Sequence, residues 1–104
     1  MIYTITLNPA LDYTISLKNL TINEINTSLN EHILPGGKGI NVSIILKRLG
    51  VESTIIGFIS GFVGEEIKRL VEIENIKTEF IKLKGENSRI NIKILEENNE
   101  TAIN

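Results

Sequence analysis

Hydrophobic and polar positions alternate along both ends of the chain, which is the pattern of β-strands with one buried face. The clearest alternation covers residues 89–95, where isoleucines occupy every second position. A short, continuous apolar run at residues 54–59 is typical instead of a strand buried in a parallel sheet. The polar run at 19–31 predicts a loop with a short, exposed strand. Together these patterns predict strands over residues 2–7, 13–17, 54–59, 79–84 and 89–95, and the start of another at 101.

Between these strands the hydrophobic spacing changes to three and four residues, which predicts two amphipathic helices. The first follows a glycine-rich turn and covers residues 40–49, with Gly50 where a glycine favours the end of a helix. The second covers residues 63–71. It carries Glu65 and Arg69 four positions apart, a spacing that predicts a modestly stabilising ion pair on the helix surface.

The order of these elements predicts an α/β fold with two parts. The strand–helix–strand–helix order in the middle of the chain predicts parallel strands covered by helices. The alternating strands before and after it predict a separate antiparallel sheet with one solvated face. The chain stops within a predicted strand and leaves two sheet edges open, so we interpret it as part of a larger protein.

The composition argues against several classes of function. The 104 residues include 11 Lys and Arg against 13 Asp and Glu, and this net charge of −2 does not suit a nucleic-acid partner. The chain has no cysteine and one histidine, so we expect no disulfide, thiolate site or histidine-rich metal site. No secretory or membrane segment is visible, which favours the cytoplasm and no membrane partner. Asp12 is the only aspartate, so chemistry that needs a second one is excluded here.

The glycine-rich turn before the first predicted helix is the strongest local signal of a ligand site. It consists of Gly36, Gly37, Lys38 and Gly39, and Asn41 lies about one turn into the helix. Glycines let a ligand approach the backbone, and the free N–H groups at a helix N-terminus attract anions and hydroxyl oxygens. The alternative is a tight turn without a ligand. The run is not a P-loop, because Gly39 stands where that motif has Ser or Thr, and the dinucleotide fingerprint also fails.

Asp12 and Arg89 are two further candidates, each with a structural alternative. Asp12 follows the first predicted strand and either caps a turn or accepts hydrogen bonds from two adjacent sugar hydroxyls. Arg89 opens an alternating strand and is either a solvated edge charge or, if it points into a cleft, a ligand for a phosphate. Asn91 and Lys93 share the face of Arg89, so that face of the strand is polar.

Five segments of the chain resemble motifs of the PfkB (ribokinase-like) carbohydrate kinase family, in the family's order and spacing. They are Thr-Leu-Asn-Pro-Ala-Leu-Asp at 6–12, Pro-Gly-Gly-Lys-Gly-Ile-Asn-Val-Ser at 35–43, Leu-Lys-Arg-Leu-Gly at 46–50, the pairs Gly57-Phe58 and Gly61-Phe62, and Arg-Ile-Asn-Ile-Lys-Ile at 89–94. The last segment is most similar to the 1-phosphofructokinase branch, whereas the tagatose-6-phosphate kinases share the first two. The resemblance implies a ribokinase-like α/β fold, with a Rossmann-like body, partial in this chain, and a small β-sheet lid.

The resemblance also implies roles for the candidate residues. The family's sugar-hydroxyl acceptor falls on Asp12, its substrate loop on residues 36–39 with Asn41, and the phosphate-binding arginine of its lid on Arg89. It implies ATP and Mg²⁺ as cofactors, a sugar phosphate as the small-molecule partner and a homodimer formed through the lid sheet. The chain lacks the Gly-Ala-Gly-Asp signature that holds the family's catalytic base. We therefore expect that base, and most of the ATP site, beyond residue 104.

This resemblance predicts that residues 1–104 are the N-terminal part of one kinase domain. The body is expected at about 1–8 and 36–76, and the lid at about 12–35 and 79–104. The parent protein is expected to convert fructose 1-phosphate to fructose 1,6-bisphosphate, and the 104-residue chain alone to be inactive, because half of the phosphoryl-transfer machinery is missing. Tagatose 6-phosphate is the alternative substrate. A non-catalytic module for sugar-phosphate binding or dimerisation is the alternative from another class.

Overall fold

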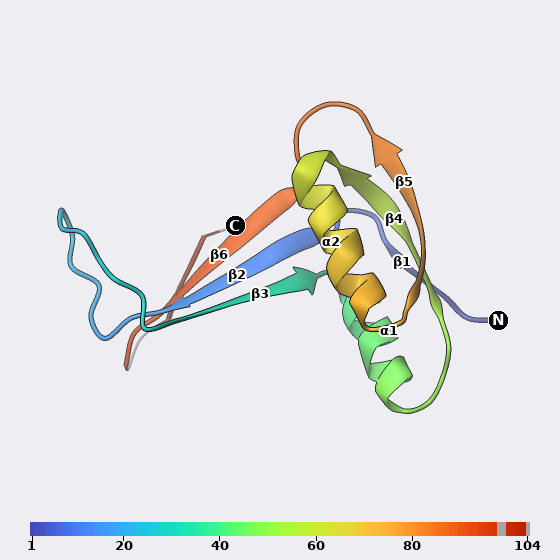
Figure 1. The fold of residues 1–104 in the computed structure, drawn as a ribbon, viewed down its shortest axis with the longest axis horizontal. Helices are drawn as coiled ribbons and strands as arrows, with labels where there is room; N and C mark the ends of the chain where they lie inside the picture. Colours follow the sequence, from blue (N-terminus) through green and yellow to red (C-terminus); the bar gives the residue numbers. More distant parts are fainter. Residues whose placement is uncertain (98–99, 104) are drawn as a thin grey trace.

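The computed structural model describes residues 1–97 and 100–103, which form two sheets and two helices (Figure 1). In Figure 1 the second sheet extends to the left, away from both helices and the first sheet. In chain order the elements are β1 Tyr3–Thr6, β2 Ala10–Ser16, β3 Asn30–Gly36, α1 Lys38–Arg48, β4 Thr54–Ser60, α2 Gly61–Ile73, β5 Lys77–Leu83, β6 Arg89–Leu95 and β7 Glu100–Ile103.

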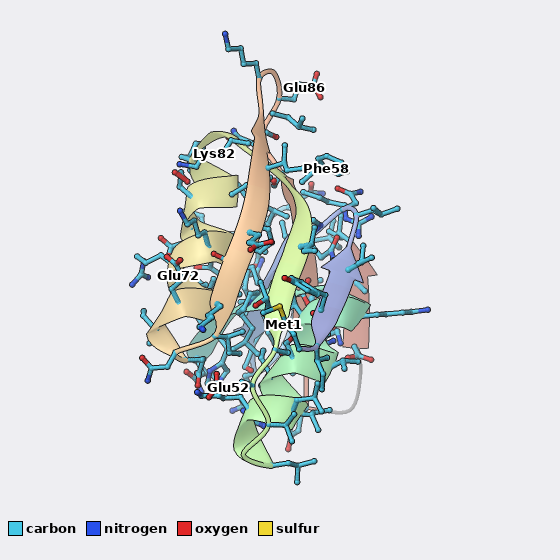
Figure 2. All side chains as sticks on the ribbon, turned by 90° about the vertical axis from the view of Figure 1, so that its right-hand side faces the viewer. Met1, Glu52, Phe58, Glu72, Lys82 and Glu86 are labelled. Atoms are coloured by element: carbon cyan, nitrogen blue, oxygen red, sulfur yellow. The ribbon has the colours of Figure 1, made fainter. Side chains whose placement is uncertain are left out.

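The first sheet is the predicted α/β body. Its strands have the order β1-β4-β5, and both neighbouring pairs are parallel. Isoleucines and valines of β4, α1 and α2 form the core between the sheet and the helices, and Leu11 of β2 joins them. The other face of this sheet is open: Phe58 is 39% exposed and lies on the side away from Glu72 of α2 (Figure 2).

The second sheet has the strand order β3-β2-β6-β7 and is mixed. The pairs β2–β3 and β6–β7 are antiparallel, as expected for hairpin neighbours. The central pair β2–β6 is parallel, so the prediction of a wholly antiparallel second sheet is wrong. The reason is topological. β2 follows β1 and β6 follows β5, and since β1 and β5 run in the same direction, both connections leave the body at the same end.

The strand predicted at 79–84 belongs to the body instead of the lid. It is β5, which begins earlier, at Lys77, and pairs with β4 along its whole length. The helix α2 between β4 and β5 makes a crossover connection, which joins neighbouring parallel strands of one sheet. In this half of the chain the second sheet therefore starts at β6, after Ser88.

Several element boundaries follow local chemistry. Gly50 has φ +81° directly after the C-cap of α1, which confirms the predicted helix end. β3 runs through Pro35, which an edge strand tolerates because its outer N–H groups have no strand partner. The predicted pair of Glu65 with Arg69 is wrong. Arg69 contacts Glu66, and Glu65 reaches Lys82 of β5 at 2.7 Å. The Glu-Asn-Asn run at 97–99 predicts a turn, and its last two positions, 98 and 99, lie outside the described residues.

Candidate functional site

Three of the predicted site residues lie at the junction between the two sheets. In the second sheet Ala10, at the start of β2, pairs with Gly36 at the end of β3 and with Arg89 at the start of β6. Asp12 lies two positions further along β2, opposite Asn91. Because alternate residues share a face, Asp12, Asn91 and Arg89 belong to the same face of the sheet. This is also the face of Gly36.

The carboxylate of Asp12 is held by its neighbour on β6. The Asn91 Nδ2 atom donates a hydrogen bond to Asp12 Oδ1 over 3.0 Å. The amide orientation follows from chemistry, because an ionised carboxylate only accepts hydrogen bonds and must therefore face the amide NH₂ group. The Asn91 Oδ1 atom is buried and accepts no hydrogen bond within the part of the chain that the structure describes. Sequence reasoning placed Asn91 on a polar face but did not foresee this contact.

Gly36 lies directly beneath the Asp12 carboxylate. A Cβ atom at position 36 would lie 2.6 Å from Asp12 Cγ and 2.7 Å from Oδ1, closer than side chains approach. The φ angle of Gly36 is not in the positive range, so this position needs glycine for space. The other oxygen of the carboxylate remains available to further donors.

The start of α1 is shaped by glycines and by a threonine from β1. Gly37 is the N-cap with φ +138°, a conformation that side chains rarely adopt, and it supplies no capping side chain. The backbone N–H of Ile40 donates to Thr6 Oγ1 over 3.0 Å. A Cβ atom at Gly39 would lie 2.6 Å from the carbonyl oxygen of Ile5, so the helix start sits tightly on β1. Lys38, the first helical residue, is exposed.

Arg89 is positioned by a connection to the end of β4. The N–H of Ser88, the preceding residue, donates to the carbonyl oxygen of Ser60 over 2.9 Å. In return the N–H of Ser60 donates to Ser88 Oγ over 2.9 Å. These two bonds hold the start of β6 against the carboxyl end of a body strand. The side chain of Arg89 is exposed.

A cavity of about 310 Å³ opens beside Asp12 on the second sheet. Asp12, Thr14, Asn91 and Lys93 provide polar groups to its wall. Lys93 Nζ lies 3.2 Å from Glu100 Oε1, so its charge is partly balanced. Tyr13, the neighbour of Asp12, donates its hydroxyl to Glu31 Oε2 over 2.9 Å, and this bond to a carboxylate raises the pKa of Tyr13.

The remaining predicted residues do not line this cavity. Lys38, Arg89 and the glycines of the turn are not part of its wall. Asn41 lines a different groove of about 500 Å³ between β3, α1 and α2, together with Ile44 and Arg48. The structure thus joins Asp12, Asn91 and Gly36 by direct contact, brings Arg89 to the same face, and puts Asn41 on the edge side of β3.

The described residues form neither a three-ligand metal cluster nor a nucleotide loop of the common kind. Within residues 1–97 and 100–103 no three His, Asp or Glu side chains lie together where they could hold a metal ion. The glycine turn lacks the P-loop pattern that cradles the phosphates of a nucleotide. In the same ranges neither helix is long and apolar enough to cross a membrane.

Comparisons with known proteins identify relatives along the whole chain. The chain is 48% identical to the 1-phosphofructokinase of Borreliella burgdorferi over 104 residues, which is 100% of the chain and 34% of the relative. It is 37% identical to a tagatose-6-phosphate kinase of Staphylococcus epidermidis over 103 residues, 99% of the chain and 33% of that protein. The crystal structure of phosphofructokinase-2 from Escherichia coli in complex with fructose-6-phosphate matches with a TM-score of 0.85 at 28% identity, covering 97% of the chain and 34% of that structure.

The chain therefore spans about a third of the length of the relatives it matches, along their N-terminal portion. The structural likeness confirms the predicted ribokinase-like α/β fold, of which these residues form a part with open sheets. The sequence model of the pfkB family carbohydrate kinases matches residues 6–104. Because this match includes nearly every residue, the chain belongs to the pfkB family of carbohydrate kinases.

Proposed function

We propose that the chain is the N-terminal segment of an ATP-dependent sugar-phosphate kinase that converts fructose 1-phosphate to fructose 1,6-bisphosphate. One observation carries the proposal at the site: a single carboxylate, Asp12, is oriented by Asn91 above a glycine and faces a cavity. The 48% identity to a 1-phosphofructokinase supports this substrate over other sugars.

Each candidate residue has a distinct task in this proposal. Asp12 accepts hydrogen bonds from two sugar hydroxyls, since a carboxylate offers two acceptor oxygens. The turn formed by Gly36, Gly37, Lys38 and Gly39 brings backbone N–H groups and one ammonium to the sugar phosphate, and Asn41 adds a hydroxyl contact. Arg89 binds the phosphate already on the sugar, because its planar guanidinium matches two phosphate oxygens. The glycines and Arg89 approach the ligand from the two strands that flank β2, since Ala10 pairs with Gly36 on one side and with Arg89 on the other.

ATP, Mg²⁺ and the catalytic base are assigned to the part of the parent enzyme beyond residue 104. The described residues offer neither a metal cluster nor a phosphate loop for a nucleotide. Phosphoryl transfer requires stabilisation of charge at both the attacking and the leaving oxygen. These residues can bind and orient the acceptor sugar only, so the 104-residue chain alone is expected to be inactive.

A coupled ADP-release assay tests the proposal. It compares the 104-residue chain with a completed chain, in which residues 1–104 continue into their own reading frame or, where that frame ends, into the remaining two thirds of the Borreliella burgdorferi relative. We expect turnover of fructose 1-phosphate by the completed chain and none by residues 1–104. A completed chain that folds but phosphorylates no ketose phosphate would refute the kinase assignment. Turnover by the short chain would refute the assignment of the catalytic base and the ATP site to the region beyond residue 104.

Tagatose 6-phosphate is the second candidate substrate, and the 37% identity to a tagatose-6-phosphate kinase favours it. Arg89 serves either sugar phosphate, so a substrate panel with both compounds decides between them. A non-catalytic sugar-phosphate-binding module predicts instead that the short chain melts at a higher temperature with fructose 1-phosphate in the absence of ATP.

A homodimer through the lid sheet is the proposed assembly. The face of this sheet opposite to Asp12 exposes Ile33, Ile90 and Ile103, which are 42%, 41% and 52% exposed. Burial of these side chains against a second copy would remove apolar surface from water. Sedimentation of the completed chain is expected to give twice the monomer mass, and Ile90→Lys is expected to give the monomer mass. A wild-type completed chain that sediments as a monomer would contradict this assembly.

A further inference from the structure

We propose that Thr6 is a positioning residue of the substrate turn: its hydroxyl caps α1 from the neighbouring strand and thereby leaves the first N–H groups of the helix to the sugar phosphate. This inference rests on the proposed function. Thr6 is 7% exposed, and its side chain lies beneath the glycine turn. It touches no ligand in this proposal, so its action is exerted through the backbone of the turn.

The side-chain cap of α1 comes from outside the helix. Helices usually begin with a Ser, Thr, Asp or Asn whose side chain accepts a hydrogen bond from the N–H two or three positions later. Here the N-cap is Gly37, which has no side chain to do this, and α1 has no side-chain cap bond of its own. Thr6 Oγ1 accepts the bond from Ile40, the third helical residue, at 3.0 Å. A residue 34 positions away in the chain thus performs the task of the N-cap.

The cap from Thr6 also determines which N–H groups of α1 are left for a ligand. The N–H of Asn41 donates to the carbonyl oxygen of Gly37 over 2.9 Å, and this is the first bond of the helical pattern. With Ile40 bound to Thr6, the N–H groups of Lys38 and Gly39 are left at the positive end of the helix. A capping side chain at position 37 would stand over these groups. The cap from β1 gives the Ile40 N–H a hydrogen-bond acceptor and leaves the N–H groups of Lys38 and Gly39 open to an anion.

The shape of the Thr6 side chain also fits the glycine turn. A Cβ atom at Gly37 would overlap the Thr6 methyl group, and one at Gly39 would overlap the Thr6 hydroxyl. The two halves of the threonine side chain therefore face two different glycines of the turn. Its methyl supports Gly37 in the positive-φ conformation, and its hydroxyl holds the helix start. Loss of the hydroxyl is expected to loosen the helix start, whereas loss of the methyl alone leaves the hydrogen bond from Ile40 in place.

The same strand offers a matched control. Thr4 is 8% exposed and points to the same side of β1, but its hydroxyl meets Ser43 Oγ at 2.7 Å, deeper along α1. Ser43 in turn accepts a bond from Ser53 at 2.7 Å. Thr4→Val removes a buried hydroxyl from the same face of the same strand and leaves the helix N-terminus untouched. A purely structural role for Thr6 predicts the same behaviour for Thr4→Val and Thr6→Val.

The test uses the completed chain with Thr6→Val, Thr6→Ser and Thr4→Val. Loss of one hydrogen bond at the turn is expected to raise KM for fructose 1-phosphate about five- to tenfold in Thr6→Val, with KM for ATP unchanged. Thr6→Ser keeps the acceptor and is expected to stay within about twofold of wild type. Thr4→Val is expected to lower the melting temperature without changing either KM.

Amide hydrogen exchange separates this inference from the proposed function. The Ile40 amide is expected to exchange about tenfold faster in Thr6→Val than in wild type, and to be unchanged in Thr4→Val. If wild type does not turn over fructose 1-phosphate, the proposed function fails, and the exchange comparison still decides the role of Thr6. Equal exchange in all variants, or the same KM change in Thr4→Val, would overturn the inference. If Thr6→Val does not fold, Thr6→Ala removes the same acceptor together with the methyl, and it is expected to raise KM for fructose 1-phosphate and Ile40 exchange at least as much.

Discussion

Substitution of Gly36 by alanine tests whether the sugar site depends on the close approach of Asp12 to the backbone. A methyl group at position 36 would lie 2.6 Å from Asp12 Cγ, whereas ordinary contacts begin at 3.4 Å. To restore an ordinary contact, the carboxylate must therefore move by about 0.8 Å, the difference between these two distances. A displacement of that size takes Asp12 away from its 3.0 Å bond with Asn91 and from the position in which it would face a sugar.

The expected loss of kcat/KM follows from the hydrogen bonds that the shift of Asp12 breaks. A hydrogen bond to a charged group contributes about 1.5–3 kcal/mol, and each 1.4 kcal/mol changes an equilibrium or rate ratio tenfold. Loss of one bond between Asp12 and a sugar hydroxyl is therefore expected to lower kcat/KM for fructose 1-phosphate by roughly 10- to 150-fold. Overpacking of the site is expected to cost about 1–3 kcal/mol of stability as well. Since the φ angle of Gly36 is not positive, backbone strain adds nothing to this cost.

A double-mutant cycle in the completed chain gives the decisive measurement. Gly36→Ala is measured by ADP release in the wild-type background and again in the Asp12→Ala background, where the space occupied by the carboxylate is free. We expect Gly36→Ala to lower kcat/KM strongly in the wild-type background and hardly at all in the Asp12→Ala background. Equal losses in both would mean that Gly36→Ala acts without Asp12, and an unchanged kcat/KM in the first would refute the reasoning.

Three further substitutions test other parts of the structure. Arg89→Lys keeps the charge but loses the planar fork, so KM for fructose 1-phosphate is expected to rise about tenfold in the ADP-release assay. Ile67→Ala empties a fully buried position in the core and is expected to cost about 2–5 kcal/mol in urea denaturation. The bond from Lys82 lowers the pKa of Glu65, so this pair stabilises the fold above the usual carboxyl pKa. Glu65→Gln should therefore melt lower than wild type at pH 7, and this difference should disappear as the pH falls below the lowered pKa.

The elements themselves could be read from the sequence because their signals are local. The apolar run before Ser60 and the spacing of Ile67 and Val71 give β4 and α2 at nearly the observed positions. Gly50 marked the end of α1 because a positive φ after a helix favours glycine. The exposed edge strand β3 was harder to predict, since it begins with three polar residues and contains Pro35, and its pairing with β2 makes it a strand.

The assignment of strands to sheets could not be read in the same way. Both β5 and β6 follow a two-residue period, which indicates that one face of the strand is buried. The period does not indicate which sheet the strand joins. Their sheets are decided by what precedes them: a crossover helix before β5, and a short connection tied to Ser60 before β6. The contacts of Thr6 with Ile40 and of Asp12 with Asn91 join residues 34 and 79 positions apart, which no local pattern encodes.

The location of the candidate site follows from the parallel arrangement of the body. All three body strands run the same way, so their carboxyl ends meet at one edge, where open α/β sheets bind ligands. The chain leaves this edge twice to form the lid, after β1 toward Asp12 and after β5 toward Arg89, and it returns once, through Gly36. Each crossing between the two sheets therefore supplies one predicted site residue. In the proposed function, a ligand at this edge would meet residues of both sheets, and the short connections at the crossings would fix how far apart these two groups of residues lie.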